Sequence, residues 1–146
     1  MVAGRELFAA QVRARLIRQG FAPDSADNTV HRLCQDGAVD NRRAAAAYAR
    51  HAAEIKSRGR RRTLRELGEL GVDTNDAKSA VDAAYAGLSD TALLGRVLSR
   101  RLAGQIETRA QFRRLYGALL RQGFEGSAVV AALKARTSST VRADDE

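Results

Sequence analysis

One short pattern, a leucine followed four residues later by a glycine and then directly by an apolar residue, occurs three times in this chain. It spans residues 16–21, 67–72 and 119–124. A glycine can take the left-handed backbone conformation that closes a helix, and the apolar residue after it can fold back onto the last turn. Gly20, Gly71 and Gly123 are spaced 51 and 52 residues apart (71 − 20 and 123 − 71). This nearly constant spacing predicts a short array of helical units.

Apolar residues recur at helical spacing through the rest of the chain, whereas no stretch alternates in the manner of a β-strand. The pattern predicts an all-α protein of eight helices, grouped as two, three and three. Pro23 suits the first turn of the second helix, while Asp40 or Asn41 and Asp73 or Thr74 are expected to cap the third and the fifth. The expected helices span about 5–19, 23–36, 41–57, 61–70, 74–86, 90–103, 107–122 and 125–136.

Small side chains supply most of the expected buried surface, because hydrophobic residues make up 45% of the chain but aromatic residues only 5%. Such a core holds helices together through many small contacts, which suits units that pack on their neighbours. Ile55, Leu64 and Leu120 are expected to point inward on the third, fourth and seventh helices. Cys34 lies on an apolar face with Leu33 and is expected to be a buried, inert thiol.

Positive charge is the strongest functional signal. The formal net charge is +8 and the sequence pI about 10.7, which favours an acidic partner such as nucleic acid, an anionic membrane surface or an acidic protein face. Residues 42–65 hold nine basic residues against Glu54 alone, and residues 96–121 hold seven against Glu107. Since the few aromatic residues are needed inside, the sequence predicts contact with a phosphate backbone or an acidic protein surface and no reading of bases.

Four arginines surround the expected start of the fourth helix, in the segment Arg58-Gly59-Arg60-Arg61-Arg62. Positive charges there oppose the helix dipole and repel one another. A local arrangement that costs stability is typical of a binding site, so these residues are the first candidates for contact with a partner. The full candidate set is Arg58, Arg60, Arg61, Arg62 and Arg65, followed by Arg113 and Arg114.

Catalytic and metal-binding chemistry has little support. His31 and His51 have no carboxylate or cysteine at a spacing suited to metal binding or nucleophile activation, and no phosphate-binding glycine loop follows a strand. We therefore expect no enzyme, no cofactor and no metal. The single cysteine excludes an internal disulfide, and no run of about 18 apolar residues exists, so a soluble cytoplasmic protein without membrane contact is expected.

Several segments resemble the RecX family, the bacterial regulators of RecA. In the middle of the chain these are residues 37–42, 48–50, 56–59 and 64–72, and towards its ends residues 15–21 and 119–124. The resemblance covers roughly residues 5–136. It implies an elongated, curved array of three tandem three-helix repeats: repeat 1 at 1–37 without its first helix, repeat 2 at 38–87 and repeat 3 at 88–137. Residues 138–146 are expected to be a disordered acidic tail.

The resemblance also implies a function in DNA repair, homologous recombination and the SOS response. A protein of this family binds in the helical groove of the RecA–DNA filament and generally inhibits the ATPase, strand-exchange and coprotease activities of RecA. The implied partners are the RecA filament and, through the backbone, single- or double-stranded DNA, with the protein acting as a monomer. The alternative is a general basic helical nucleic-acid-binding protein without a RecA role, which would bind bare DNA tightly with a steep salt dependence.

Overall fold

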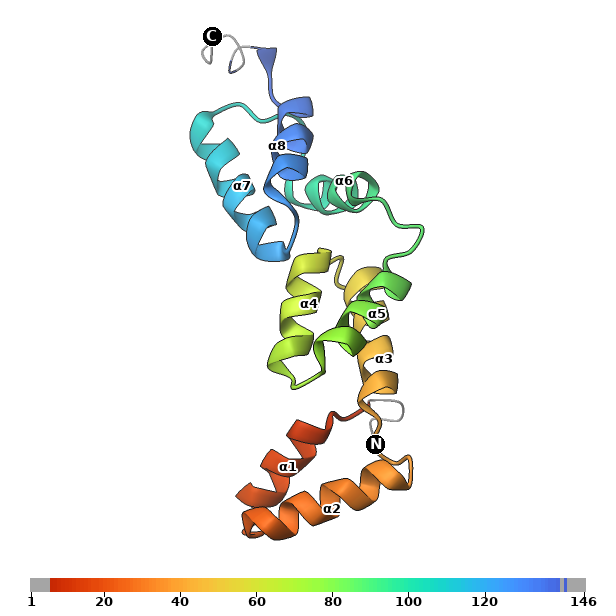
Figure 1. The fold of residues 1–146 in the computed structure, drawn as a ribbon. Helices are drawn as coiled ribbons and strands as arrows, with labels where there is room; N and C mark the ends of the chain where they lie inside the picture. Colours follow the sequence, from red (N-terminus) through yellow and green to blue (C-terminus); the bar gives the residue numbers. More distant parts are fainter. Residues whose placement is uncertain (1–5, 140, 142–146) are drawn as a thin grey trace. The chain divides into compact units, whose positions relative to one another are not determined.

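The computed structural model describes residues 6–139 and 141, and within them it is all-helical (Figure 1). The predicted fold class and the predicted number of helices are confirmed for this part of the chain. Outside the helices, the backbone makes one isolated parallel bridge, between Ile106 and Thr137. The helices are α1 (Ala9–Arg18), α2 (Pro23–Gln35), α3 (Asn41–Glu54), α4 (Arg60–Glu69), α5 (Thr74–Ala84), α6 (Asp90–Arg101), α7 (Arg109–Gln122) and α8 (Gly126–Ala135).

The chain forms two compact units. The first comprises residues 1–51 and 64–84, and the second comprises residues 52–63 and 85–146. In the first unit α1 packs on α2, and in the second both α6 and α7 pack on α8. The second unit therefore contains a module of three helices, α6, α7 and α8.

The three glycine helix ends are confirmed as the same motif. Gly20, Gly71 and Gly123 have φ values of +101°, +87° and +106°, in the left-handed region. In each motif the apolar residue after the glycine donates its N–H to the leucine five residues back, over 3.1, 3.0 and 3.2 Å in chain order. This bond satisfies a carbonyl that the helix leaves without a partner, and it turns the chain back over the last turn.

The predicted caps of α3 and α5 are also confirmed. The Asp40 carboxylate accepts from the backbone N–H groups of Arg42 and Arg43 at 2.9 and 3.2 Å, and Asp73 accepts from Asn75 at 2.9 Å. Each carboxylate satisfies backbone donors in the first turn and opposes the positive end of the helix dipole.

The first helix begins later than predicted, at Ala9 rather than near residue 5, because Phe8 is used in the core. Phe8 has an extended backbone, is 3% exposed and makes an edge-to-face contact with Tyr48, with ring centroids 6.2 Å apart. Its N–H donates to the side chain of Gln11, and the next N–H, of Ala9, donates to the side chain of Asn41. The first bond is accepted by the third residue of α1 itself, and the second satisfies the first helical N–H from outside the helix.

Four apolar positions lie nearer to solvent than predicted. Ile55 is 62% exposed because α3 ends at Glu54, and Leu64 and Leu120 are each 37% exposed. On α4 the inward positions one turn apart are Thr63 and Leu67, which leaves Leu64 at the edge of the buried face. Cys34 is exposed, so the prediction of a buried thiol is wrong.

The beginning of the predicted C-terminal tail is packed. Thr137, Ser138 and Val141 are 5–7% exposed, and Ser138 donates its N–H to Ile106 at 3.0 Å. The rest of the predicted tail, residues 140 and 142–146, lies outside the described residues. None of the helices described is long and apolar enough to span a bilayer.

Candidate anion-binding site

The first candidate arginine, Arg58, lies in the link from α3 to α4. Within the second unit, this link packs against the end of α7. The Gly59 N–H donates to the Gln122 carbonyl at 2.9 Å, and the Gln122 side chain donates to the carbonyls of Lys56 and Ser57 at 3.1 and 3.3 Å. A Cβ atom on Gly59 would overlap the backbone of Gly123. The two glycines are therefore needed for this close approach of two backbones.

This contact changes the electrostatics expected at the start of α4. The last carbonyls of α7 carry the partial negative charge of a helix C-terminus, and they lie against the turn that carries the arginines. A Cβ on Gly123 would overlap Arg62 itself, which places this arginine at the end of α7. The dipole conflict seen in the sequence is thus offset by a neighbouring helix end.

The buried side chain of Tyr85 holds the segment of residues 58–62, the arginine turn, in place. Its ring is 3% exposed, and its hydroxyl donates to the Arg58 carbonyl at 2.5 Å and lies 2.8 Å from the Thr63 hydroxyl. The Arg60 guanidinium carbon lies 5.8 Å from the centre of the same ring, which is a cation–π distance. Sequence analysis did not single out Tyr85 as a functional residue. The sequence feature that could have indicated this role is a tyrosine on a buried helix face, since a buried hydroxyl needs a hydrogen-bond partner.

Replacing Tyr85 by Phe is expected to lower the free energy of unfolding by about 1–2 kcal/mol, because the buried Arg58 carbonyl and Thr63 hydroxyl lose a partner. Chemical denaturation followed by circular dichroism measures this change. Tyr116→Phe on half-buried Tyr116 is the matched control, with an expected change within about 0.5 kcal/mol. Equal losses in the two variants would contradict the positioning role of Tyr85.

The predicted arginines of the segment 58–65 differ in exposure. Arg60, Arg61 and Arg65 are exposed on α4, whereas Arg58 and Arg62 are half-buried. Arg65 forms an i,i+4 ion pair with Glu69 at 3.7 Å, with both side chains more than 60% exposed. Such a pair contributes less than about 1 kcal/mol and yields readily to a stronger anion.

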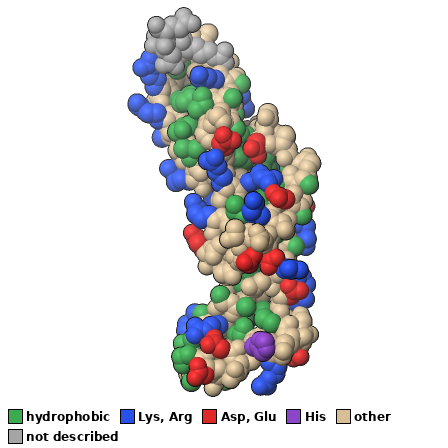
Figure 2. Space-filling model, in the orientation of Figure 1, with side chains coloured by type: hydrophobic (Ala, Val, Ile, Leu, Met, Phe, Trp, Pro, Cys, Tyr) green, Lys and Arg blue, Asp and Glu red, His purple; other side chains and the backbone are tan. Residues whose placement is uncertain are grey.

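Arg113 and Arg114 are exposed on α7, nine and ten residues before Gly123. At a rise of 1.5 Å per residue they lie about 14 Å along the helix from the Gly59 contact. Figure 2 shows Lys and Arg side chains following the edge that α7 forms in Figure 1. These two arginines therefore extend the basic surface of the second unit and do not join the turn at Gly59.

Other basic residues in the run 42–65 are engaged by acidic residues distant in sequence. Arg42 pairs with Asp76 at 3.1 Å, and Arg43 pairs with Glu6 at 2.8 Å. The hydrogen bond that Arg43 donates to Glu6, together with the charges of Glu6 and Asp40, raises the pKa of Arg43. Ion pairs with residues 34 and 37 positions away thus engage the first two arginines of the run.

Metal-binding residues do not come together in the described part of the chain. No group of three or more His, Cys, Asp or Glu side chains that could hold an ion occurs among residues 6–139 and 141. His31 and His51 are exposed on separate helices. The described residues form a helical protein with arginines exposed on α4 and α7.

Comparison with known proteins gives the family of this helical protein. No family model matches the chain. It is 35% identical over 132 residues to proteins named Regulatory protein RecX from Xanthomonas axonopodis pv. citri (strain 306) and Xanthomonas citri, covering 89% of this chain and 79% of each relative. The crystal structure of RecX from Lactobacillus salivarius shares the fold, with a TM-score of 0.63 over 92% of this chain and 88% of that one at 15% identity. The chain belongs to the RecX family.

Proposed function

We propose that this protein binds the RecA–DNA filament and inhibits the ATPase, strand-exchange and coprotease activities of RecA. The observation that carries the proposal is membership in the RecX family, combined with exposed arginines on α4 and α7. An assembly of RecA on DNA offers both phosphates and protein carboxylates, and guanidinium groups bind both through paired hydrogen bonds.

The proposed contacts are made by Arg58, Arg60, Arg61, Arg62, Arg65, Arg113 and Arg114. Arg60, Arg61 and Arg65 reach outward from α4, while the backbone of residues 56–59 is held by Gln122 and Tyr85. A fixed backbone reduces the conformational entropy that binding must remove. A rigid helical protein held to neighbouring RecA protomers would resist the movements between them that ATP hydrolysis and strand exchange require.

The repeat boundaries at residues 37 and 87 belong to the same proposal. Each proposed repeat contains one of the glycine-closed helices α1, α4 and α7. Repeats that contact only their neighbours build extended surfaces, and such surfaces suit a filament partner.

The direct test is RecA ATPase on single-stranded DNA with and without this protein. The ATPase rate is expected to fall as the protein is added, and the inhibition is expected to weaken as salt rises from about 50 to about 200 mM, because exposed charges are screened. Binding to bare single-stranded DNA is the companion measurement, and it should be much weaker than binding to the filament. Tight binding to bare DNA with an unchanged RecA ATPase would instead favour the general nucleic-acid-binding protein.

A further inference from the structure

The end of α1 is open to solvent, although the equivalent ends of α4 and α7 are buried. Phe21 is 46% exposed, whereas the residues at its place in the other two motifs, Val72 and Phe124, are 6% and 3% exposed. The leucine whose carbonyl each of them contacts differs in the same way: Leu16 is half-buried, and its equivalents on α4 and α7 are 0% exposed. Two copies of the motif are thus packed, and the third presents its apolar residue to solvent.

The start of a helix lies against each of the two buried ends. In the second unit, a Cβ atom on Gly123 would lie 2.9 Å from the carbonyl oxygen of Gly59, which directly precedes α4. In the first unit, a Cβ atom on Gly71 would lie 3.1 Å from the Cβ of Ala10, the second residue of α1. A Cβ atom on Gly20 would meet no atom of the described residues within 4 Å. Gly20 therefore leaves open the place that a helix start with a small residue fills in the other two motifs.

Positive charge flanks this open surface. Arg15 and Arg18 are exposed in the last turn of α1, and neither guanidinium forms an ion pair within residues 6–139 and 141. Ile17 and Arg18 precede Phe21 by four and three positions, so they lie on the same side of the last turn. Figure 2 shows Lys and Arg side chains beside hydrophobic ones on the part of the first unit that holds α1 and α2. Charge complementarity therefore favours an acidic occupant, and acidic residues also stabilise the start of a helix.

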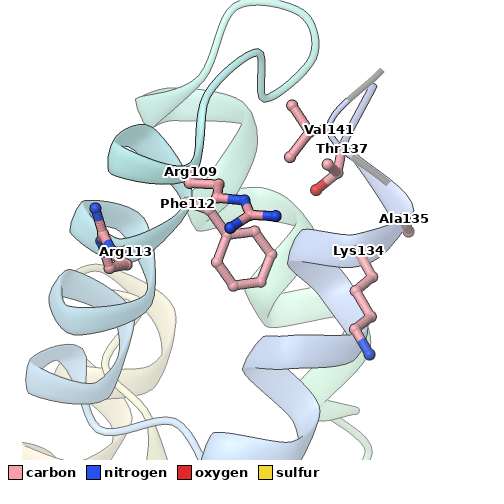
Figure 3. Close-up of a pocket in the computed structure, with 7 residues that line it drawn as sticks. All are labelled: Arg109, Phe112, Arg113, Lys134, Ala135, Thr137 and Val141. Carbon is pink, nitrogen blue, oxygen red and sulfur yellow. The ribbon is translucent and has the colours of Figure 1, made fainter. Parts of the chain in front are cut away.

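The corresponding segment of a second copy of this chain is already covered. The link from α6 to α7 precedes α7 as Gly59 precedes α4, and within it Ile106 donates its N–H to the Arg136 carbonyl at 2.7 Å. Figure 3 shows Thr137 and Val141, from the same C-terminal segment, lining a pocket with side chains from the start of α7. The occupant of the open end is therefore expected to come from a different protein.

We propose that the open end of α1 binds the start of an acidic helix in a partner protein. A small residue of that helix lies against Gly20, an apolar residue packs on Phe21, and carboxylates of its first turns pair with Arg15 and Arg18. This surface includes none of the arginines proposed to contact RecA and DNA, so the inference goes beyond the proposed function.

The test is fluorescence anisotropy with labelled 13-residue peptides and the whole protein. The first peptide has the sequence of residues 6–18, the segment that contacts Gly71 in the first unit, with its three arginines replaced by Glu. The second also carries Ala10→Leu, which puts a bulky side chain against the glycine, and the third keeps the three arginines. We expect the first peptide to bind at least about tenfold more tightly than either of the others, because it alone combines a small residue at the contact with opposite charge.

Phe21→Ala links this binding to the end of α1. The substitution is expected to weaken binding of the first peptide by about tenfold or more, since an aromatic anchor carries much of such an interaction. Ile55→Ala is the matched control: Ile55 is 62% exposed in the second unit, and its truncation should change binding by less than about twofold. Circular dichroism checks that both variants remain folded.

Arg15→Glu combined with Arg18→Glu tests the charge. The double variant is expected to weaken binding of the first peptide by about tenfold or more, and to leave inhibition of the RecA ATPase in place. The control is Arg96→Glu combined with Arg100→Glu, which reverses two exposed charges on α6 and should change peptide binding by less than about twofold. Because peptide binding and RecA inhibition are measured separately, failure of this proposal is distinguished from failure of the proposed function.

Three results would overturn the proposal. Equal binding of the first peptide and its Ala10→Leu form would show attraction without a fit to the glycine. Binding to phosphatidylglycerol vesicles that is lost in Phe21→Ala, without binding of the first peptide, would assign the surface to a membrane. A dimer in analytical ultracentrifugation that Phe21→Ala dissociates would assign it to a second copy of the chain.

Discussion

Replacing Arg60, Arg61 and Arg65 together by Glu is expected to abolish inhibition of the RecA ATPase while leaving the helical circular dichroism unchanged. All three side chains are exposed on α4, and their replacement changes the net charge by about −6. A hydrogen bond to a charged group contributes about 1.5 kcal/mol or more, so losing three of them raises the protein concentration needed for inhibition by about a thousandfold. Repulsion between the new carboxylates and phosphate adds to this loss.

Folding should survive these substitutions. The Arg65–Glu69 pair is exposed and contributes little. Replacing Arg60 also removes its cation–π contact with Tyr85, but Glu at the first two positions of α4 interacts favourably with the dipole of that helix. Arg58 and Arg62 are left in place because both are half-buried and contact the structure around Gly123 and Tyr85.

The control carries the same change of charge on other helices. Arg15, Arg18 and Arg32 are exposed on α1 and α2 and lie outside the candidate set. Their replacement by Glu should leave most of the inhibition in place at moderate salt, since long-range charge effects are screened. Equal loss of inhibition in both triple variants would mean that net charge alone matters, and full inhibition by the α4 variant would remove the assignment of these arginines.

The features that sequence analysis predicted well are those determined within a few residues. The glycine helix ends need only a residue that accepts positive φ and an apolar neighbour, and the caps need a carboxylate two or three positions before the donors that it satisfies. Both are local chemistry. The eight helices and most of their bounds follow from such signals together with apolar spacing.

The errors concern contacts between segments distant in the sequence. Phe8 lies outside its predicted helix because its ring packs against Tyr48, 40 residues away, while the N–H of the next residue, Ala9, donates to the side chain of Asn41. Thr63 was not among the predicted core residues, yet it is buried, and its hydroxyl lies 2.8 Å from that of Tyr85. Contacts between residues so far apart produce no periodic pattern in the sequence, and they override the local preference of a residue for helix or surface.

The candidate site shows the same division. The run of arginines is visible in the sequence, but which of them are engaged is not. Arg42 and Arg43 find carboxylates 34 and 37 residues away, and the end of α7 reaches the turn at Gly59 from more than sixty residues along the chain. The close contact between Gly59 and Gly123 was therefore beyond sequence analysis, although each glycine was recognised as a helix breaker.

Replacing Gly59 by Ala is expected to lower the free energy of unfolding by about 3 kcal/mol or more and the melting temperature by about 10 °C. The added Cβ would overlap the Gly123 carbonyl, and these are backbone atoms that cannot turn aside as a side chain can. Removing this overlap requires moving the α3–α4 link away from α7. That movement breaks the hydrogen bond from the Gly59 N–H to the Gln122 carbonyl and those from the Gln122 side chain to Lys56 and Ser57.

Gly68→Ala is the matched control for this substitution. Gly68 lies inside α4, and a Cβ atom added there meets no other atom within 4 Å. Because alanine favours a helix over glycine, this variant should be up to about 1 kcal/mol more stable than the parent protein. Thermal unfolding followed by circular dichroism compares the two, and similar melting temperatures would show that the Gly59–Gly123 approach is not required. If Gly59 also holds the arginine turn in place, the folded fraction of Gly59→Ala should inhibit RecA less than an equal amount of Gly68→Ala.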